Sequence, residues 1–238
     1  MDPRAAAGAD VRPGGQPRIV DFGDAALLVV LGESIDLVLN RRVHRLAALL
    51  EARHAGDERW GRPVPGYASL LVPYDPLRLT ATEARADSAQ CVAETETAAP
   101  EDEPGPVAPF EIPVAYGGPD GPDLEDVADR LGLAPAGVIE LHAAPTYRVF
   151  LVGFSPGFPY LGPLPDALVL PRRETPRTAV PAGSVAIAGR QAGVYPVAGP
   201  GGWHLLGRTS LSLWDPRRRP PALLGPGAAV RFVPVRAG

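Results

Sequence analysis

The chain has 238 residues, of which 45% are hydrophobic and 21% charged, so it can bury the core of one large domain or of two small ones. Its formal net charge of −4 argues against a nucleic-acid partner, because neutralising phosphates needs a basic surface. The 30 prolines and 27 glycines stand between short apolar runs, as turns do in β-rich proteins.

All 23 basic residues are arginines, so the chain contains no lysine. Without lysine there is no Walker-type group for nucleotide phosphates and no Schiff-base chemistry. Covalent biotin or lipoate on this chain is excluded as well, since both are attached to lysine. A GC-rich genome that encodes arginine in place of lysine is the simplest cause, and the exclusions hold whatever the cause.

Cys91 is the only cysteine, which excludes an intrachain disulfide and argues against a metal cluster. The N-terminal residues lack the apolar core of a signal peptide. No apolar run approaches the roughly 20 residues that span a bilayer. We therefore expect a cytoplasmic protein with no metal site and no membrane partner.

Composition divides the chain into four parts. The stretch ETETAAPEDEPGPVAP is acidic, rich in proline and nearly free of large apolar residues, which is the composition of a linker. The predicted parts are a disordered tail (1–16), a small α+β domain (17–93), the acidic linker (94–109) and a second domain (110–238).

The first domain shows helical and strand patterns. Apolar residues recur with helical spacing from Ile35 to Leu50, and Ser34 or Asp36 can cap that helix. A weaker helical pattern covers residues 79–92. Strands are predicted at residues 18–20, 25–31 and 68–74.

The second domain opens with a predicted strand at residues 110–116. Asp123 begins a short helix, and a further helix covers residues 135–142. From Tyr147 onward, Gly and Pro break the sequence into short apolar runs roughly 8 to 12 residues apart, which predicts a β-barrel or sandwich. These runs are TYRVFLVGF, ALVLP, GSVAIAG, GVYPVAG, WHLLGRTSLSLW and AAVRFVPV.

Residues 153–162 read GFSPGFPYLG and predict a stiff loop that carries aromatic rings. The prolines fix φ and the glycines allow positive φ, so the backbone is held before a ligand arrives and binding costs less ordering. Each ring alone suits the core, but for the loop as a unit we favour a binding surface. Ser155 is not in a GxSxG elbow and is not interpreted as a nucleophile. The candidate binding residues of this loop are Phe154, Pro156, Gly157, Phe158 and Tyr160.

Residues 172–178 read RRETPRT and place three arginines in six residues. Arginine forks bind carboxylates and phosphates. The alternative is a solvated turn in which Glu174 is the internal partner. We take Arg177, in its proline-flanked turn, as a candidate catalytic residue. Arg172 and Thr178 are candidate binding residues.

Two small-residue turns, VPAGS at 180–184 and AGRQAG at 188–193, present backbone amides that can receive an anionic or carbonyl oxygen. Gln191 adds a neutral donor and acceptor and is a second candidate catalytic residue. The candidate binding residues of these turns and of the following loop are Pro181, Gly183, Ser184, Tyr195, Gly201, Gly202 and Trp203.

Four histidines are present. His142 ends a predicted helix, where a histidine suits the helix dipole, and it is the best candidate for a general acid or base. His44 and His54 are expected on the surface of the first domain. His204 and Trp203 are neighbours in a strand and therefore point to different faces.

Three long motifs resemble the allophanate hydrolase subunit 1 family. They are GFSPGFPYLGPLP, LPRRETPRTAVPAGSVAIAG and QAGVYPVAGPGGWHLLGRTSLSLWDP, and the earlier segments EIPVAYGGPDGPDL and GDAALLVVLGESIDLVLNRRV resemble it too. The resemblance covers roughly residues 18–235. It implies an α+β fold, with a small N-terminal α+β domain followed by a cyclophilin-like β-barrel domain.

The resemblance implies three alternative functions. The favoured one is the B subunit of an ATP-dependent 5-oxoprolinase, a hydrolase that opens the lactam 5-oxoproline to glutamate. That enzyme would act only with its A and C subunits, and ATP would be bound with those partners. The second is one half of a carboxyltransferase that uses carboxybiotin held elsewhere and a urea- or amide-like substrate. The third is a KipI-like inhibitor of a histidine kinase. Prolyl isomerase activity rests on the barrel alone, and a fold does not imply a function.

Overall fold

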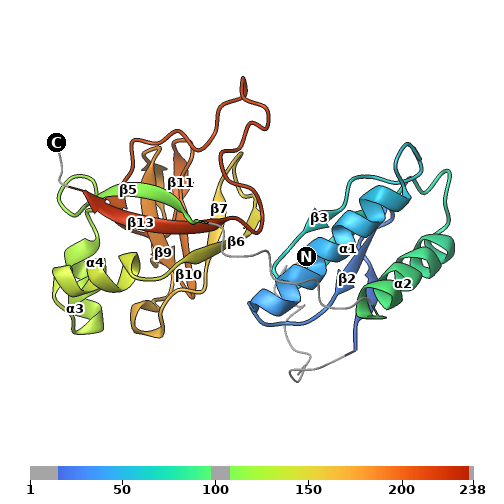
Figure 1. The fold of residues 1–238 in the computed structure, drawn as a ribbon, viewed down its shortest axis with the longest axis horizontal. Helices are drawn as coiled ribbons and strands as arrows, with labels where there is room; N and C mark the ends of the chain where they lie inside the picture. Colours follow the sequence, from blue (N-terminus) through green and yellow to red (C-terminus); the bar gives the residue numbers. More distant parts are fainter. Residues whose placement is uncertain (1–15, 98–107, 236–238) are drawn as a thin grey trace. The chain divides into compact units, whose positions relative to one another are not determined.

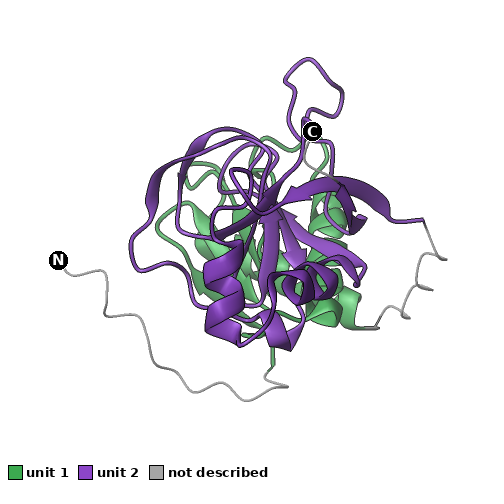
Figure 2. Ribbon diagram, turned by 90° about the vertical axis from the view of Figure 1, so that its left-hand side faces the viewer, with its two compact units in different colours: residues 1–103 green, residues 104–238 purple. Residues whose placement is uncertain are grey.

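The computed structural model describes residues 16–97 and 108–235 and divides the chain into two compact units. Figure 2 colours them separately: Met1–Glu103 and Pro104–Gly238. The predicted α+β class, with a small α+β domain before a barrel, is confirmed. None of the helices in the described ranges is long and apolar enough to cross a membrane.

The first unit is a four-stranded sheet packed against two helices (Figure 1). The strands lie in the order β1-β2-β4-β3, and all neighbours are antiparallel. Leu27, Val29, Leu70 and Val72 from the two central strands form the core with residues of both helices. The elements are β1 (Arg18–Asp21), β2 (Ala26–Val30), α1 (Leu37–Arg53), β3 (Val64–Pro65), β4 (Ser69–Pro73) and α2 (Ala81–Thr97).

Helix α1 follows the predicted spacing, because Val43, Leu46 and Leu50 are fully buried. Asp36 is its N-cap, and its Oδ1 accepts hydrogen bonds from the backbone amides of residues 38 and 39 at 2.8 and 2.9 Å. The open choice between Ser34 and Asp36 is therefore decided for Asp36, whose short carboxylate reaches the free amides of the first turn.

Helix α2 extends to Thr97, further than the pattern predicted. Residues 94–97, which the composition assigned to the linker, are therefore helical. Cys91 and Val92 on the buried side of the helix hold its last turns against the core. The rest of the predicted linker and the predicted tail lie largely outside the described residues, so the linker remains a prediction.

The second unit is a closed barrel with strand order β10-β7-β6-β13-β5-β12-β9. Strands β5 and β13 pair in parallel over six residues, and the other described barrel pairs are antiparallel. The barrel strands are β5 (Phe110–Tyr116), β6 (Tyr147–Val152), β7 (Pro159–Gly162), β9 (Ser184–Ala188), β10 (Gln191–Val194), β12 (His204–Arg208) and β13 (Ala229–Val235). Outside the barrel lie α3 (Leu124–Leu131), α4 (Pro135–Ala143), the 3₁₀ helix η1 (Asp166–Leu168) and the two-stranded sheet of β8 (Arg177–Val180) and β11 (Gly199–Gly201).

The predicted strand ALVLP is wrong. Its first residues form η1, and only Leu170 makes an isolated bridge, to Gly189. The predicted strand WHLLGRTSLSLW shortens to β12, and strands β7, β8 and β11 were not predicted as such. Proline and glycine at their ends make these strands too short to show a periodic pattern.

Side chains of strand β9 alternate between two hydrophobic clusters. Val185 and Ile187 belong to the main core, which also includes residues of α3 and α4. Ala186 and Ala188 belong to a smaller cluster built around aromatic rings. This second face of the sheet carries the candidate site.

Candidate functional site

A hollow of about 260 Å³ lies over the aromatic cluster of the second unit. It combines segments far apart in the chain: the stiff loop before β7, the segment between η1 and β8, and the chain from β10 to β12. We call it the aromatic hollow. Its lining residues are Phe154, Phe158, Tyr160, Arg172, Arg173, Pro176, Tyr195, Pro200, Gly201, Gly202 and Trp203.

The floor of the hollow is made of rings in edge-to-face contact. The ring centre of Phe158 lies 4.9 Å from that of Tyr160, 5.2 Å from that of Tyr195 and 5.5 Å from that of Trp203. Phe158, Tyr195 and Trp203 are almost completely buried. Such contacts fix each ring by its neighbours, so the floor is formed before a ligand arrives.

Two glycines leave the room that these rings need. A Cβ on Gly193 would lie 2.8 Å from Cζ of Phe158, and a Cβ on Gly201 would lie 2.3 Å from the hydroxyl of Tyr195. A side chain at either position would displace a ring. These glycines therefore serve packing of the aromatic floor.

Phe154 stands apart from the other rings, because 66% of it is exposed. It is also the one non-glycine residue with positive φ in the described ranges, at 68°. The loop around it is closed by hydrogen bonds from the amide of Gly153 to the Phe158 carbonyl and from the amide of Phe158 to the Ser155 carbonyl, both 3.1 Å. A strained conformation that holds an apolar ring in solvent brings no packing gain and indicates a binding role.

Asp123 is the ion-pair partner of the RRETPRT segment, and the predicted alternative partner Glu174 is not. Its carboxylate accepts hydrogen bonds from Arg177 at 2.7 and 2.9 Å, from Arg173 at 2.9 Å and from the backbone amide of Leu205 at 2.7 Å. Burial raises the pKa of Asp123, but the hydrogen bonds from Arg177 and Leu205 outweigh it and hold this pKa below its usual value. Asp123 precedes α3 as predicted, yet its side chain caps no helix amide.

This pairing corrects the prediction for Arg177. Arg177 does not line the hollow, and its guanidinium is occupied by Asp123. Arg172 does line it, is exposed, and makes no hydrogen bond or ion pair with another described residue. Three arginines and one buried aspartate leave an excess of positive charge at the rim. An anionic group of a ligand would find its partner in Arg172.

The predicted amide sites at the small-residue turns are wrong, because those amides are already used. The amide of Gly183 donates to the Tyr195 carbonyl at 2.7 Å, and that of Gly189 to the Leu170 carbonyl at 2.6 Å. The amide of Ser184 is directed to the Pro181 carbonyl at 3.3 Å. The turns join strands and offer no open donors here. Pro181 and Thr178 are exposed and lie outside the hollow.

His142 and Gln191 lie away from the hollow as well. His142 is completely buried beside Phe232, with ring centres 4.4 Å apart, and its Nδ1 lies 2.7 Å from the hydroxyl of Tyr116. Burial lowers its pKa to about 3. These facts favour a packing role for His142. Gln191 is buried in β10, and its Nε2 has no hydrogen-bond partner among the described residues.

The hollow thus gathers eight of the predicted residues, among them Gly201 and Gly202, and leaves the three predicted catalytic residues outside. Pro156 and Gly157 belong to the loop but not to the lining. Sequence reasoning did not assign a role to Arg173 or to the carboxylate of Asp123. The adjacency of Arg173 to Arg172 was the available signal, whereas a single aspartate 50 residues from Arg173 gives none.

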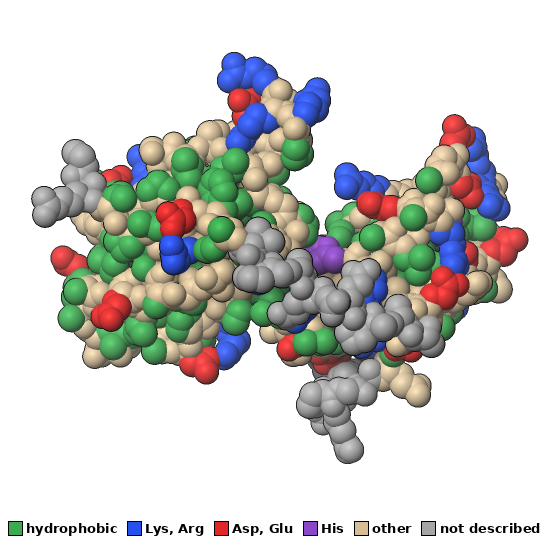
Figure 3. All heavy atoms as spheres, viewed as in Figure 1, with side chains coloured by type: hydrophobic (Ala, Val, Ile, Leu, Met, Phe, Trp, Pro, Cys, Tyr) green, Lys and Arg blue, Asp and Glu red, His purple; other side chains and the backbone are tan. Residues whose placement is uncertain are grey.

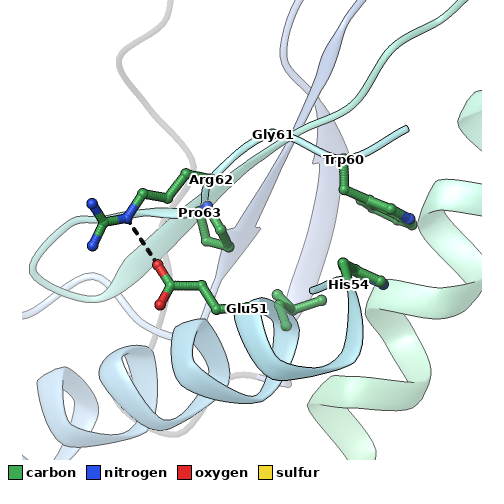
Figure 4. Close-up of a pocket in the computed structure, with 7 residues that line it drawn as sticks. Glu51, His54, Trp60, Gly61, Arg62 and Pro63 are labelled. Atoms are coloured by element: carbon green, nitrogen blue, oxygen red, sulfur yellow. Dashed lines mark hydrogen bonds and ion pairs between the residues drawn. The ribbon is translucent and has the colours of Figure 1, made fainter. Parts of the chain in front are cut away.

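The first unit has a second, shallower hollow of about 240 Å³ (Figure 4). The ring of His54 stacks on Trp60 with centres 3.9 Å apart, and its Nε2 lies 2.9 Å from a carboxylate oxygen of Asp87. At its rim Arg62 donates to Glu51 at 3.0 Å. The expectation of a surface His54 is wrong, because only 10% of its side chain is exposed. No predicted site residue lies here.

Metal binding has no candidate in the parts of the chain that are described. No group of three or more His, Cys, Asp or Glu side chains lies close enough together there to hold an ion.

Residues 17–224 match the carboxyltransferase domain family, subdomain C and D. The B subunit of the 5-oxoprolinase of Escherichia coli O157:H7 is 44% identical over 91% of this chain and 95% of its own length. That of Bacillus subtilis (strain 168) is 40% identical over 91% of this chain and 92% of its own. A two-unit protein with this barrel and an aromatic hollow therefore belongs to the carboxyltransferase domain class. Within that class, the chain belongs to the family of 5-oxoprolinase B subunits.

Solved structures agree with the fold. The protein TTHA0988 superposes with a TM-score of 0.76 at 39% identity, over 90% of this chain and 40% of that longer chain. The urea carboxylase of Kluyveromyces lactis superposes with a TM-score of 0.75 at 22% identity, over 92% of this chain and 22% of that one. At this identity the likeness concerns the fold alone.

Proposed function

We propose that this chain is the B subunit of an ATP-dependent 5-oxoprolinase and that the aromatic hollow receives 5-oxoproline. The observation that carries the proposal is the position of Arg172 beside a preformed aromatic floor. Its context is a chain whose relatives at 40–52% identity are named as the B subunit of 5-oxoprolinase.

The chemistry of 5-oxoproline fits this arrangement. The molecule is a five-membered lactam that carries one carboxylate. The carboxylate suits the fork of Arg172, and the flat ring suits the rings of Phe158 and Trp203. The hollow of about 260 Å³ is smaller than the roughly 300–1,000 Å³ of sites for larger ligands, which favours a small substrate over a nucleoside triphosphate.

ATP is therefore assigned to the partner subunits in this proposal. An ordinary lactam is a poor electrophile, and ATP supplies the activation of its carbonyl oxygen. The part of this chain is to bind the carboxylate, orient the ring and exclude water from one side of it. The A and C subunits complete the site, since the described residues around the hollow include no activated nucleophile.

Replacement of Arg172 tests the proposal. In a complex of this chain with the A and C subunits, Arg172→Ala should raise the KM for 5-oxoproline and lower kcat/KM about tenfold or more, because one charge-assisted contact is lost. Glutamate release and ATP hydrolysis measured together report the effect. Unaltered kcat/KM in the variant would exclude Arg172 from substrate binding.

Two further variants serve as controls. Arg130→Ala removes an exposed arginine of α3 and should leave both stability and turnover unchanged. Arg177→Ala should lower the melting temperature, because the buried carboxylate of Asp123 loses two hydrogen bonds. Arg172→Ala should leave that temperature unaltered, so the two arginines are separated by stability as well as by kinetics.

The family description also favours a second candidate, the transfer of a carboxyl group to an amide-like substrate. Such a substrate presents the same flat amide to the hollow, and carboxybiotin would come from a separate carrier because this chain has no lysine. Production of glutamate from 5-oxoproline without a biotin carrier decides for the first function. Transfer that requires the carrier decides for the second.

A further inference from the structure

The segment from Trp214 to Ala222 leaves the barrel unit as a projecting loop, seen in orange-red in Figure 1. We call it the arginine loop, because its tip reads DPRRRPP. Its base is fixed: Leu213 and Leu224 are buried in the main core, and Trp214 bridges to Ala222. The amide of Leu223 donates to the Leu213 carbonyl at 2.8 Å. A loop anchored at both ends holds its tip in a defined place.

The tip is ordered by its own hydrogen bonds. Asp215 Oδ1 accepts from the amide and from Nε of Arg217 at 2.9 and 3.1 Å. Arg218 donates to the Ser212 carbonyl at 2.8 Å, and Arg219 donates to the Pro216 carbonyl at 3.1 Å. The three prolines of the tip restrict φ further. The cost of ordering this loop on binding is therefore small.

The loop concentrates positive charge without an opposing surface. Three consecutive arginines face one aspartate, and 89% of the Arg217 side chain is exposed. Figure 3 shows these basic side chains gathered on the projection. The Nε of Arg218 is buried and has no hydrogen-bond partner among the described residues. Nothing in the barrel requires arginines at this tip, so their place points to a ligand outside the unit.

The arginine loop touches the stiff aromatic loop. A Cβ on Gly157 would lie 3.1 Å from Cβ of Trp214 and 3.2 Å from the carbonyl oxygen of Leu213, so the two backbones are in close contact. Gly157 is three residues from Phe154, the exposed ring at positive φ. An unpartnered aromatic ring and a cluster of arginines are thus carried by two loops that support each other. Arginine and aromatic residues are the types enriched where protein interfaces concentrate binding energy.

We propose that Phe154 and the arginine loop form one docking surface for an acidic face of the C subunit. This inference rests on the proposed function, which supplies that partner. An acidic protein fits better than a nucleic acid, because the arginine cluster is narrow, the whole chain is acidic, and Phe154 needs an apolar pocket. The arginines would steer the encounter, and the ring would fill a pocket at the centre of the contact.

The test measures binding of the purified C subunit to the full chain at low and at high salt. The double variant Arg217→Glu and Arg219→Glu should weaken binding about tenfold or more and remove the dependence of the association rate on salt. Phe154→Ser should weaken binding while the salt dependence stays. The matched control, Arg130→Glu with Arg148→Glu, changes the charge of the same unit by the same amount and should bind as the unaltered chain does.

Several outcomes overturn the inference. Equal binding by the double variant and the unaltered chain would do so, and so would equal weakening in the control. Loss of a self-association of this chain, with binding of the C subunit preserved, would assign the loop to a second copy instead. Turnover of 5-oxoproline by the unaltered complex is measured separately. Its absence with normal subunit binding would defeat the proposed function and leave the docking surface standing.

Discussion

At the scale of single residues, the three arginines of RRETPRT have different roles because they have different partners. Arg177 and Arg173 share the buried carboxylate of Asp123, whereas Arg172 faces the hollow alone among the described residues. A buried carboxylate needs such partners, since an unpaired charge there costs several kcal/mol. The same residue type thus supports the loop at two positions and offers binding at the third.

His142 gives a test of burial through pH. Its folded-state pKa is about 3, whereas an unfolded histidine has a pKa of about 6.5. Below about pH 6.5 the unfolded chain therefore binds a proton that the folded chain does not, and stability falls as pH falls. Urea unfolding should show a loss of about 2 kcal/mol from this group between about pH 7 and pH 5.

The variant His142→Gln should abolish that part of the pH dependence while it lowers stability at neutral pH through lost packing against Phe232. His44→Gln, in helix α1, should retain the difference between the two pH values. An undiminished pH dependence in His142→Gln would mean that the imidazole is hydrated in the folded protein.

What the sequence could predict at this scale follows from how local each signal is. The aromatic loop and Arg172 carry their signal in neighbouring residues, and the structure gathers them in the hollow. The role of Asp123 depends on Arg173 and Arg177, 50 and 54 residues away in the chain. The burial of His142 depends on Phe232. No pattern in the sequence expresses such distant contacts.

At the scale of elements, the turn at Gly183 joins three strands. Its amide bonds the Tyr195 carbonyl, its carbonyl accepts from Thr209, and its φ is 83°. A Cβ there would lie 2.2 Å from the carbonyl oxygen of Thr209. Gly189 also has positive φ, at 56°, but nothing lies within 4 Å of a Cβ at that position.

The two glycines allow steric clash to be separated from backbone strain. Gly189→Ala should cost about 1 kcal/mol of unfolding free energy through φ alone. Gly183→Ala adds the clash and should cost about 2–4 kcal/mol. Urea unfolding of both full-length variants measures the difference. Equal costs would show that the turn at Gly183 can shift to make room.

Elements with a long apolar period were predictable, and short ones were not. Helix α1 repeats its pattern over several turns, so its spacing alone located it. Strands β8 and β11 are four and three residues long, contain glycine or lie beside proline, and exist because they pair with each other. The arginine loop has no apolar period at all, and only its three-dimensional anchoring makes it recognisable.

At the scale of the whole molecule, charge is divided between the units. The unit Met1–Glu103 has 11 arginines and 17 acidic residues, whereas Pro104–Gly238 has 12 arginines and 10 acidic residues. The net charge of −4 therefore conceals a basic barrel unit that carries both the hollow and the arginine loop. Composition over the full length could exclude nucleic acid as a partner but could not show where a basic contact lies.

Each unit also has hydrophobic clusters of its own. The cluster of the first unit contains residues from 27 to 92, and the two clusters of the second contain residues from 112 to 232. Since burial of such clusters is the main stabilising term, each unit has what it needs to fold alone. We expect fragments 16–97 and 108–238, expressed separately, to unfold cooperatively in urea.

The midpoint of each fragment should match one transition of the full chain, because no cluster is cut. A matched control cuts the barrel after Gly162, between β7 and η1, and separates Leu161 from its pairing partner Ala192. That fragment should lack a cooperative transition, since the closed sheet cannot form. If fragment 108–238 also failed to fold while the full chain did, the barrel would depend on the first unit, and the sequence boundary near residues 94–109 would mark a joint within one cooperative domain.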